Sequence, residues 1–144
     1  MRINKYRVEL VKEQGINYEM ATTPQAAADI LERIFSASKR CEEHTWELCM
    51  DTKGKVVGVF ELATGAMSGC IMDTASVARN ALLTNAYGVI IAHNHPSGDP
   101  TPSREDIQVT GRIKAGLELL GITLHDHIII GDTALSMREH GYIQ

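Results

Sequence analysis

The sequence has 144 residues, of which 44% are hydrophobic and 22% charged, and its formal net charge is -4. A chain of about 100–200 residues makes one domain, whose core needs neither a disulfide nor a metal in order to fold. The negative charge argues against a broad basic face for nucleic acid, and an aromatic content of 5% argues against a row of base-stacking rings.

The cysteines and the apolar segments predict the cellular compartment of the protein. The 3 cysteines, Cys41, Cys49 and Cys70, show no C-x-x-C spacing, so they predict neither a disulfide framework nor a cysteine zinc site. The N-terminus lacks the apolar region of a secretory signal, and the longest apolar runs are too short to span a bilayer. We therefore expect a reduced, cytoplasmic protein without membrane contact.

The N-terminal half predicts, in order, a short strand or hairpin, a helix and a β-hairpin, over residues 6–12, 23–38 and 45–62. Polar and apolar side chains alternate in the first segment, and Gln14 and Gly15 follow as a turn. Thr23 followed by Pro24 is a typical helix start, because threonine caps and proline suits the first helical position.

The C-terminal half predicts a helix, a buried strand, a second helix and two strands, over residues 73–85, 87–92, 103–120, 122–130 and 134–137. The apolar face expected for the helix over 103–120 consists of Ile107, Ile113, Leu117 and Leu120. Strands mixed with helices in one short chain indicate an α/β or α+β fold, with helices packed on a mixed, curved sheet. We expect a single domain over residues 1–144, with 1–22 as an N-terminal extension in a strand or hairpin.

Two histidines follow the predicted buried strand. His93 and His95 are two residues apart, so their rings are expected to project from one face. A proline-rich loop leads from there to Asp106, near the start of the next helix. Two imidazoles and a carboxylate can hold zinc and leave a fourth position open for a water, whose pKa the metal lowers to about 7. This set predicts a catalytic metal site.

Ser103 has two compatible interpretations. Ser-x-x-Asp before an apolar run is a helix capping box, which is a structural device and the better interpretation of that spelling alone. If the helix begins near Ser103, the hydroxyl also lies near the predicted metal, where it could stabilise an oxyanion.

The whole pattern resembles a known family. His-x-His-Pro at 93–96, followed after the loop by Ser103 and Asp106, resembles the JAMM motif of the JAB1/MPN metalloprotease superfamily. The amino-acid sequence at residues 92–98, 126–131 and 141–143 resembles that of the RadC-like branch, and the resemblance covers about residues 24–143. It implies a JAB/MPN domain that binds one zinc ion per chain through His93, His95 and Asp106.

The resemblance also implies an upstream glutamate that acts as general base. Glu43 matches it, because the segment after it then falls into the register of the family's hairpin. A carboxylate at that place could take a proton from water and pass it to a leaving amine. On sequence alone Glu42, Glu47 and Glu61 remain alternatives, and Glu47 would share a strand face with Glu43.

The remaining histidines carry weaker signals. His125 and His127 form a second pair, two residues apart in a predicted strand, and the neighbouring sequence predicts no third ligand. We favour a structural role for them, with Asp126 orienting a ring, and keep His127 as a secondary site candidate. His44 and His140 receive no functional interpretation.

These features favour a zinc metallohydrolase, a peptidase or isopeptidase, with Glu43 as base and Ser103 at the oxyanion. The expected partner is a peptide or protein substrate of unknown identity, and a homo-oligomer stays open. The alternative is a DNA-repair accessory protein without robust peptidase activity, since the RadC family name is attached to repair. Longer family members carry a helix-hairpin-helix module that this sequence lacks, so nucleic-acid binding by this domain is not expected.

Overall fold

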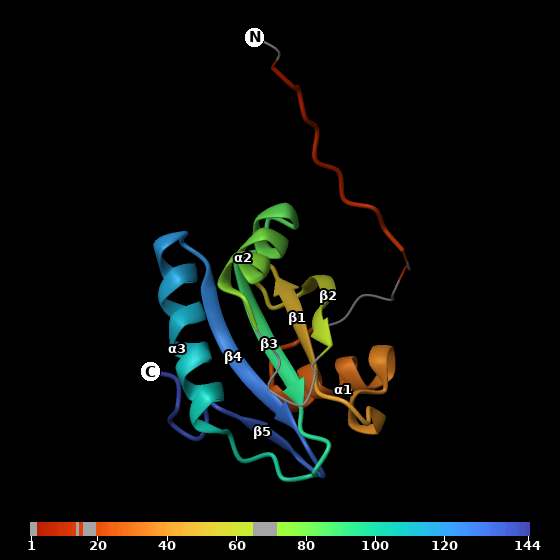
Figure 1. Ribbon diagram of the computed structural model, residues 1–144, viewed down its shortest axis with the longest axis vertical. Helices are drawn as coiled ribbons and strands as arrows, with labels where there is room; N and C mark the ends of the chain where they lie inside the picture. The colour runs from red at the N-terminus through yellow and green to blue at the C-terminus, as the bar shows by residue number, and fades with distance from the viewer. Residues whose placement is uncertain (1–2, 14, 16–19, 65–71) are drawn as a thin grey trace.

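The computed structural model describes residues 3–13, 15, 20–64 and 72–144. In this part of the chain one five-stranded mixed sheet has the order β2-β1-β3-β4-β5 (Figure 1). β3 and β4 are parallel, and the other neighbours are antiparallel. The elements are α1 (Pro24–Phe35), the 3-10 turn η1 (Ala37–Lys39), β1 (His44–Met50), β2 (Val56–Thr64), α2 (Thr74–Leu83), β3 (Gly88–Asn94), α3 (Arg104–Leu119), β4 (Thr123–Ile130) and β5 (Ala134–Ser136).

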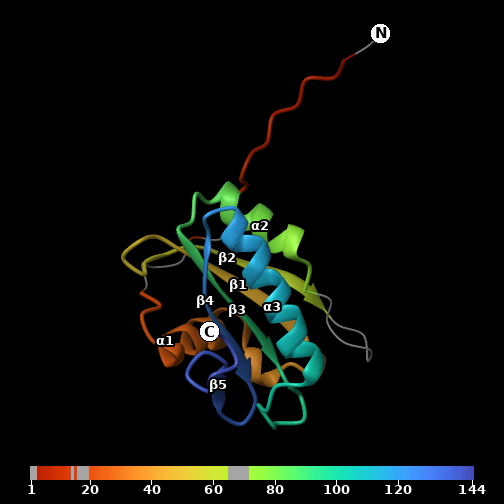
Figure 2. The ribbon, with the colours of Figure 1, turned by 90° about the vertical axis from the view of Figure 1, so that its left-hand side faces the viewer.

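The helices cover both faces of the sheet, so the predicted single α/β domain is confirmed. α1 packs on one face, where Leu31 meets Trp46 and Ile128 in a buried cluster. α2 and α3 pack side by side on the other face (Figure 2). β3 lies in the middle of the sheet and every one of its residues is buried, as its continuous apolar run predicted.

The first helix begins as predicted and ends early. The Thr23 side chain accepts a hydrogen bond from the backbone N–H of Ala26 at 3.1 Å, and Pro24 occupies the first helical position. The helix stops at Phe35 because Ser36 adopts a left-handed conformation with φ of 50°. The predicted end at Ser38 is therefore a separate 3-10 turn.

The buried face of α3 differs from the predicted apolar face. Ile107 and Leu120 are 38% and 51% exposed, so both predictions were wrong. The buried side chains are Asp106, Thr110, Ile113 and Leu117. The first turns of this helix thus bury polar groups, and only its later turns bury apolar ones.

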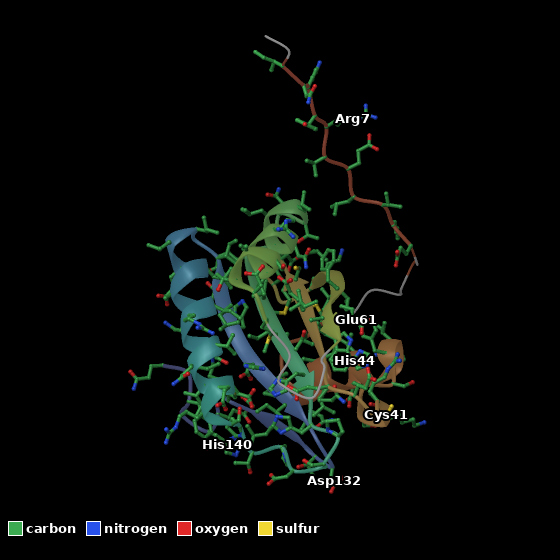
Figure 3. All side chains as sticks on the ribbon, viewed as in Figure 1. Arg7, Cys41, His44, Glu61, Asp132 and His140 are labelled. Carbon is green, nitrogen blue, oxygen red and sulfur yellow. The ribbon has the colours of Figure 1, made fainter. Side chains whose placement is uncertain are left out.

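The N-terminal segment lies outside the sheet. Residues 3–13 are exposed and have no regular secondary structure, so the strand predicted over 6–12 is not formed (Figure 3, where Arg7 marks the segment). The predicted turn at Gln14 falls outside the described residues. Met20 forms an isolated antiparallel bridge with Lys55. Among the described helices, none has the length and apolar character needed to cross a membrane.

Candidate metal centre

Four side chains converge where β3 ends. Glu43, His93, His95 and Asp106 each offer a ligand atom, and these atoms all lie within 4.8 Å of one another. The two histidine Nε2 atoms are 2.8 Å apart. Asp106 places Oδ1 3.4 Å from His93 Nε2 and Oδ2 3.4 Å from His95 Nε2. Glu43 Oε1 lies 3.9 Å from His93 Nε2.

The sheet register explains why the first two groups meet. Thr45 pairs with His93 across the antiparallel strands β1 and β3. Glu43 precedes β1 directly, so it reaches the end of β3 beside His93. His93 is fully buried, whereas the Glu43 side chain is 29% exposed, so the site opens toward solvent on the glutamate side.

The backbone around Glu43 is held by Asn94, which lies between the two histidines. The Asn94 side chain is buried, and its Oδ1 accepts a hydrogen bond from the His44 N–H at 2.7 Å. Its Nδ2 donates to the carbonyls of Glu42 at 2.9 Å and Arg40 at 3.3 Å. This amide therefore ties both sides of Glu43 to β3.

His95 is positioned by the proline-rich loop and the β4–β5 turn. Its N–H donates to the Ile130 carbonyl, and its ring Nδ1 faces the Asp99 carbonyl, each at 2.8 Å. The turn holds the loop in return, because the Asp132 N–H donates to the Gly98 carbonyl at 2.7 Å (Asp132 is labelled in Figure 3).

Asp106 is fixed by a capping box at the start of α3. The Ser103 hydroxyl accepts from the Asp106 N–H at 3.0 Å, and the Ser103 N–H donates to Asp106 Oδ2 at 2.8 Å. Ser103 therefore forms the helix capping box that its sequence pattern predicted. Its predicted catalytic role stays a prediction.

His127 lies behind the site instead of within it. It does not belong to the group of four convergent side chains found among the described residues. Its Nε2 lies 2.7 Å from His93 Nδ1. Its other ring nitrogen, Nδ1, lies 2.6 Å from Thr110 Oγ1. Sequence reasoning missed Thr110, although its spacing of one helical turn from Asp106 was a usable signal.

Asp126 does not orient the His127 ring, so that expectation was wrong. Its carboxylate accepts from the backbone N–H groups of His127 and Arg138 and from the Ser136 hydroxyl. His125 does not share the surroundings of His127. The β3–β4 pairing shifts register at this point, so no residue of β3 lies directly opposite His125. The His125 ring centroid lies 6.3 Å from that of Tyr87.

The three glutamates that were alternatives to Glu43 do not belong to the group of four convergent side chains among the described residues. Glu47 is fully buried and accepts from Asn80 Nδ2 at 2.9 Å, and its Oε1 lies 3.5 Å from the Cys49 thiol. Glu61 pairs with His44 at 2.5 Å (Figure 3). The Glu42 side chain is exposed.

Burial and hydrogen bonds shift several ionisation equilibria. Burial opposes ionisation of Asp106, but hydrogen bonds with His93 and His95 outweigh it and hold the pKa of Asp106 well below its usual range. The bond to Asp106 raises the pKa of His95. Burial lowers the pKa of His127, and the nearby His93 lowers it further. Burial raises the pKa of Glu47 to about 7.

The four convergent groups fit a divalent cation. Two imidazole nitrogens that face each other at 2.8 Å can share only one proton, whereas a cation satisfies both lone pairs. Two histidines with a carboxylate are a typical donor set for zinc and related metals. The group could therefore hold a metal ion.

The sequence is similar to known proteins of one family. The model of the RadC-like JAB domain family matches residues 21–142. A UPF0758 protein of Coprothermobacter proteolyticus is 41% identical over 84% of this chain and 52% of its own length. One from Methanococcoides burtonii is 38% identical over 83% of this chain and 53% of its own. One from Thermotoga maritima is 36% identical over 92% of this chain and 70% of its own.

The chain spans about half the length of the first two relatives. The family match covers the first helix, all strands of the sheet and the four convergent residues. By its sequence, this protein belongs to the RadC-like JAB domain family.

Proposed function

We propose that the protein is a zinc-dependent hydrolase of peptide or isopeptide bonds. One observation carries the proposal: a partly exposed carboxylate, Glu43, converges on two histidines and an aspartate at the end of a buried strand. Three ligands and a separate carboxylate are the parts that metal-assisted hydrolysis requires. The family resemblance supports the same chemistry.

His93 and His95 would bind zinc through their Nε2 atoms, and Asp106 would bind it through its carboxylate. When bound, zinc acts as a Lewis acid and lowers the pKa of water to about 7. The low pKa of Asp106 keeps this ligand ionised. The capping box holds the same carboxylate in place, so the ligand is oriented before any metal arrives.

Glu43 and Ser103 would act on the substrate. Glu43 Oε1 would accept a proton from the attacking water and return it to the leaving nitrogen. The Ser103 hydroxyl accepts one hydrogen bond from the Asp106 N–H, so its own proton can be donated to an oxyanion.

Metal analysis tests the ligand assignment. The purified protein is expected to bind about one zinc per chain, whereas His95→Ala and Asp106→Ala are expected to lose it or hold it much more weakly. His125→Ala is the matched control, because this histidine lies away from the site. Full zinc occupancy in both ligand variants would contradict the assignment.

Replacement of Glu43 by glutamine tests the mechanism. Glu43→Gln should retain zinc and lose turnover, because glutamine cannot exchange the proton. Cleavage of a peptide mixture and of a lysine-linked isopeptide can be followed by mass spectrometry, with the exposed Glu42→Gln as control. Undiminished turnover in Glu43→Gln would assign the proton transfer to another group.

A further inference from the structure

A chain of buried polar side chains continues from the metal centre into the core. His93 Nδ1 lies 2.7 Å from His127 Nε2, and His127 Nδ1 lies 2.6 Å from Thr110 Oγ1. Thr110 Oγ1 lies 2.6 Å from the backbone carbonyl of Asp106. Thr110 is 2% exposed and both histidines 0%, so water does not compete for these bonds.

The last link sets the direction of the whole chain. A carbonyl oxygen only accepts, so an oxygen–oxygen separation of 2.6 Å requires that the Thr110 hydroxyl donate to Asp106. The Thr110 oxygen then accepts from His127 Nδ1–H, which leaves His127 Nε2 as an acceptor. His127 Nε2 in turn accepts from His93 Nδ1–H. The Nε2 lone pair of His93 is thereby turned toward Glu43 and Asp106.

The same contacts form a closed ring. The Asp106 carboxylate faces His93 from the metal side, at 3.4 Å, while its backbone carbonyl receives the Thr110 hydroxyl from the core side. The ring joins β3, β4 and α3, which are three separate elements. His127 and Thr110 therefore support two of the proposed ligands, His93 and Asp106.

From this geometry we propose that His127, held by Thr110, is a positioning residue that fixes the ring orientation and tautomer of His93 for metal binding. The proposal rests on the proposed function, because it assumes that His93 is a ligand. Groups that hydrogen-bond to the far nitrogen of a metal-bound histidine commonly change metal affinity by about 10–100-fold. His127 is accordingly assigned a role in the affinity of the site and not in proton transfer to substrate.

A matched pair of substitutions tests the threonine. Thr110→Val keeps the shape and removes the hydroxyl, whereas Thr110→Ser keeps the hydroxyl. Competition with a chromophoric chelator should show zinc affinity weakened by about 10-fold or more in Thr110→Val and largely restored in Thr110→Ser. Equal zinc affinities in these two folded variants would overturn the proposal, whatever their thermal stabilities.

A second pair tests His127 directly. His127→Gln supplies an amide oxygen near the position of Nε2 and should bind zinc more tightly than His127→Leu. Proton–nitrogen NMR of labelled histidine rings should show His93 and His127 each protonated at Nδ1 in the wild type. A proton on His127 Nε2 would overturn the proposal.

The outcomes separate the two proposals. If the wild type binds zinc but cleaves no peptide, the proposed hydrolase fails while the positioning role stands on the affinity measurements. If it hydrolyses peptides and Thr110→Val binds zinc as tightly as Thr110→Ser, only the positioning role fails. If the wild type binds no zinc, both fail together.

Discussion

At the scale of single residues, Asn94 links the candidate metal ligands to the proposed base. Its three hydrogen bonds go to the backbone of Arg40, Glu42 and His44, so they fix the chain on both sides of Glu43 without using the metal-facing atoms of the site. Asn94→Ala should therefore retain zinc while kcat falls on the order of 100-fold, because a small displacement of a catalytic group has a large effect on rate. Zinc content and kcat should be measured on the same preparation.

The loss of three buried hydrogen bonds also lowers stability, so the rate must be compared well below the unfolding temperature. A variant that is less stable but has unchanged kcat would show that Asn94 serves folding alone. A variant that loses zinc would show instead that it positions the neighbouring histidines.

Glu47 predicts a pH dependence of stability. Burial raises its pKa in the folded protein to about 7, above the value of 4.5 expected in the unfolded chain. The folded state thus binds more protons between these values, so the contribution of Glu47 to stability is present below pH 4.5 and falls until about pH 7. Glu47→Gln, which stays neutral, should gain on the order of 3 kcal/mol relative to wild type across this interval.

Urea unfolding of both proteins in chelator, at several pH values, measures this difference. The advantage of Glu47→Gln should grow up to about pH 7 and then remain constant at higher pH. A difference that is the same at every pH would mean that Glu47 has no raised pKa in the fold.

At the scale of elements, the proline-rich loop rests against the β4–β5 turn. A Cβ at Gly131 would lie 2.3 Å from the Gly98 carbonyl oxygen, which is too close for any side chain. Gly131→Ala should therefore push the loop and His95 away from the site. We expect a loss of about 1–3 kcal/mol in unfolding free energy and a weaker zinc affinity.

Gly111→Ala is the matched control within α3. A Cβ there meets no atom within 4 Å, so alanine should stabilise the helix by about 0.5–1 kcal/mol and leave zinc affinity unchanged. Urea unfolding and chelator competition measure both quantities. If Gly131→Ala behaved like Gly111→Ala, the loop would not depend on the close approach.

Sequence periodicity predicted the helices and strands better than it predicted the support of the site. The run that became β3 and the cap at Ser103 are local patterns, so sequence alone was sufficient for them. The buried stripe of α3 was missed because it begins with Asp106 and Thr110, which an apolar pattern does not include. Thr110 contacts His127 from β4 and Asp106 faces His93 from β3, and no local pattern contains either contact.

At the scale of the whole molecule, the candidate ligands come from distant parts of the chain. Glu43 precedes β1, His93 and His95 lie at the end of β3, and Asp106 lies in α3. In the unfolded chain these groups are far apart, so a metal that binds all of them favours the folded state. Metal binding and the stability of the entire sheet are therefore linked.

This linkage predicts a large effect of zinc on thermal unfolding. At a free zinc concentration 100 times Kd, the stabilisation is about 2.7 kcal/mol, which for a chain of this size raises Tm by about 10 °C. Differential scanning calorimetry with zinc and after chelation should show this shift in the wild type and not in His95→Ala. An equal shift in His95→Ala would mean that zinc stabilises the fold from another position, since the linkage acts only through groups that hold the metal in the folded state.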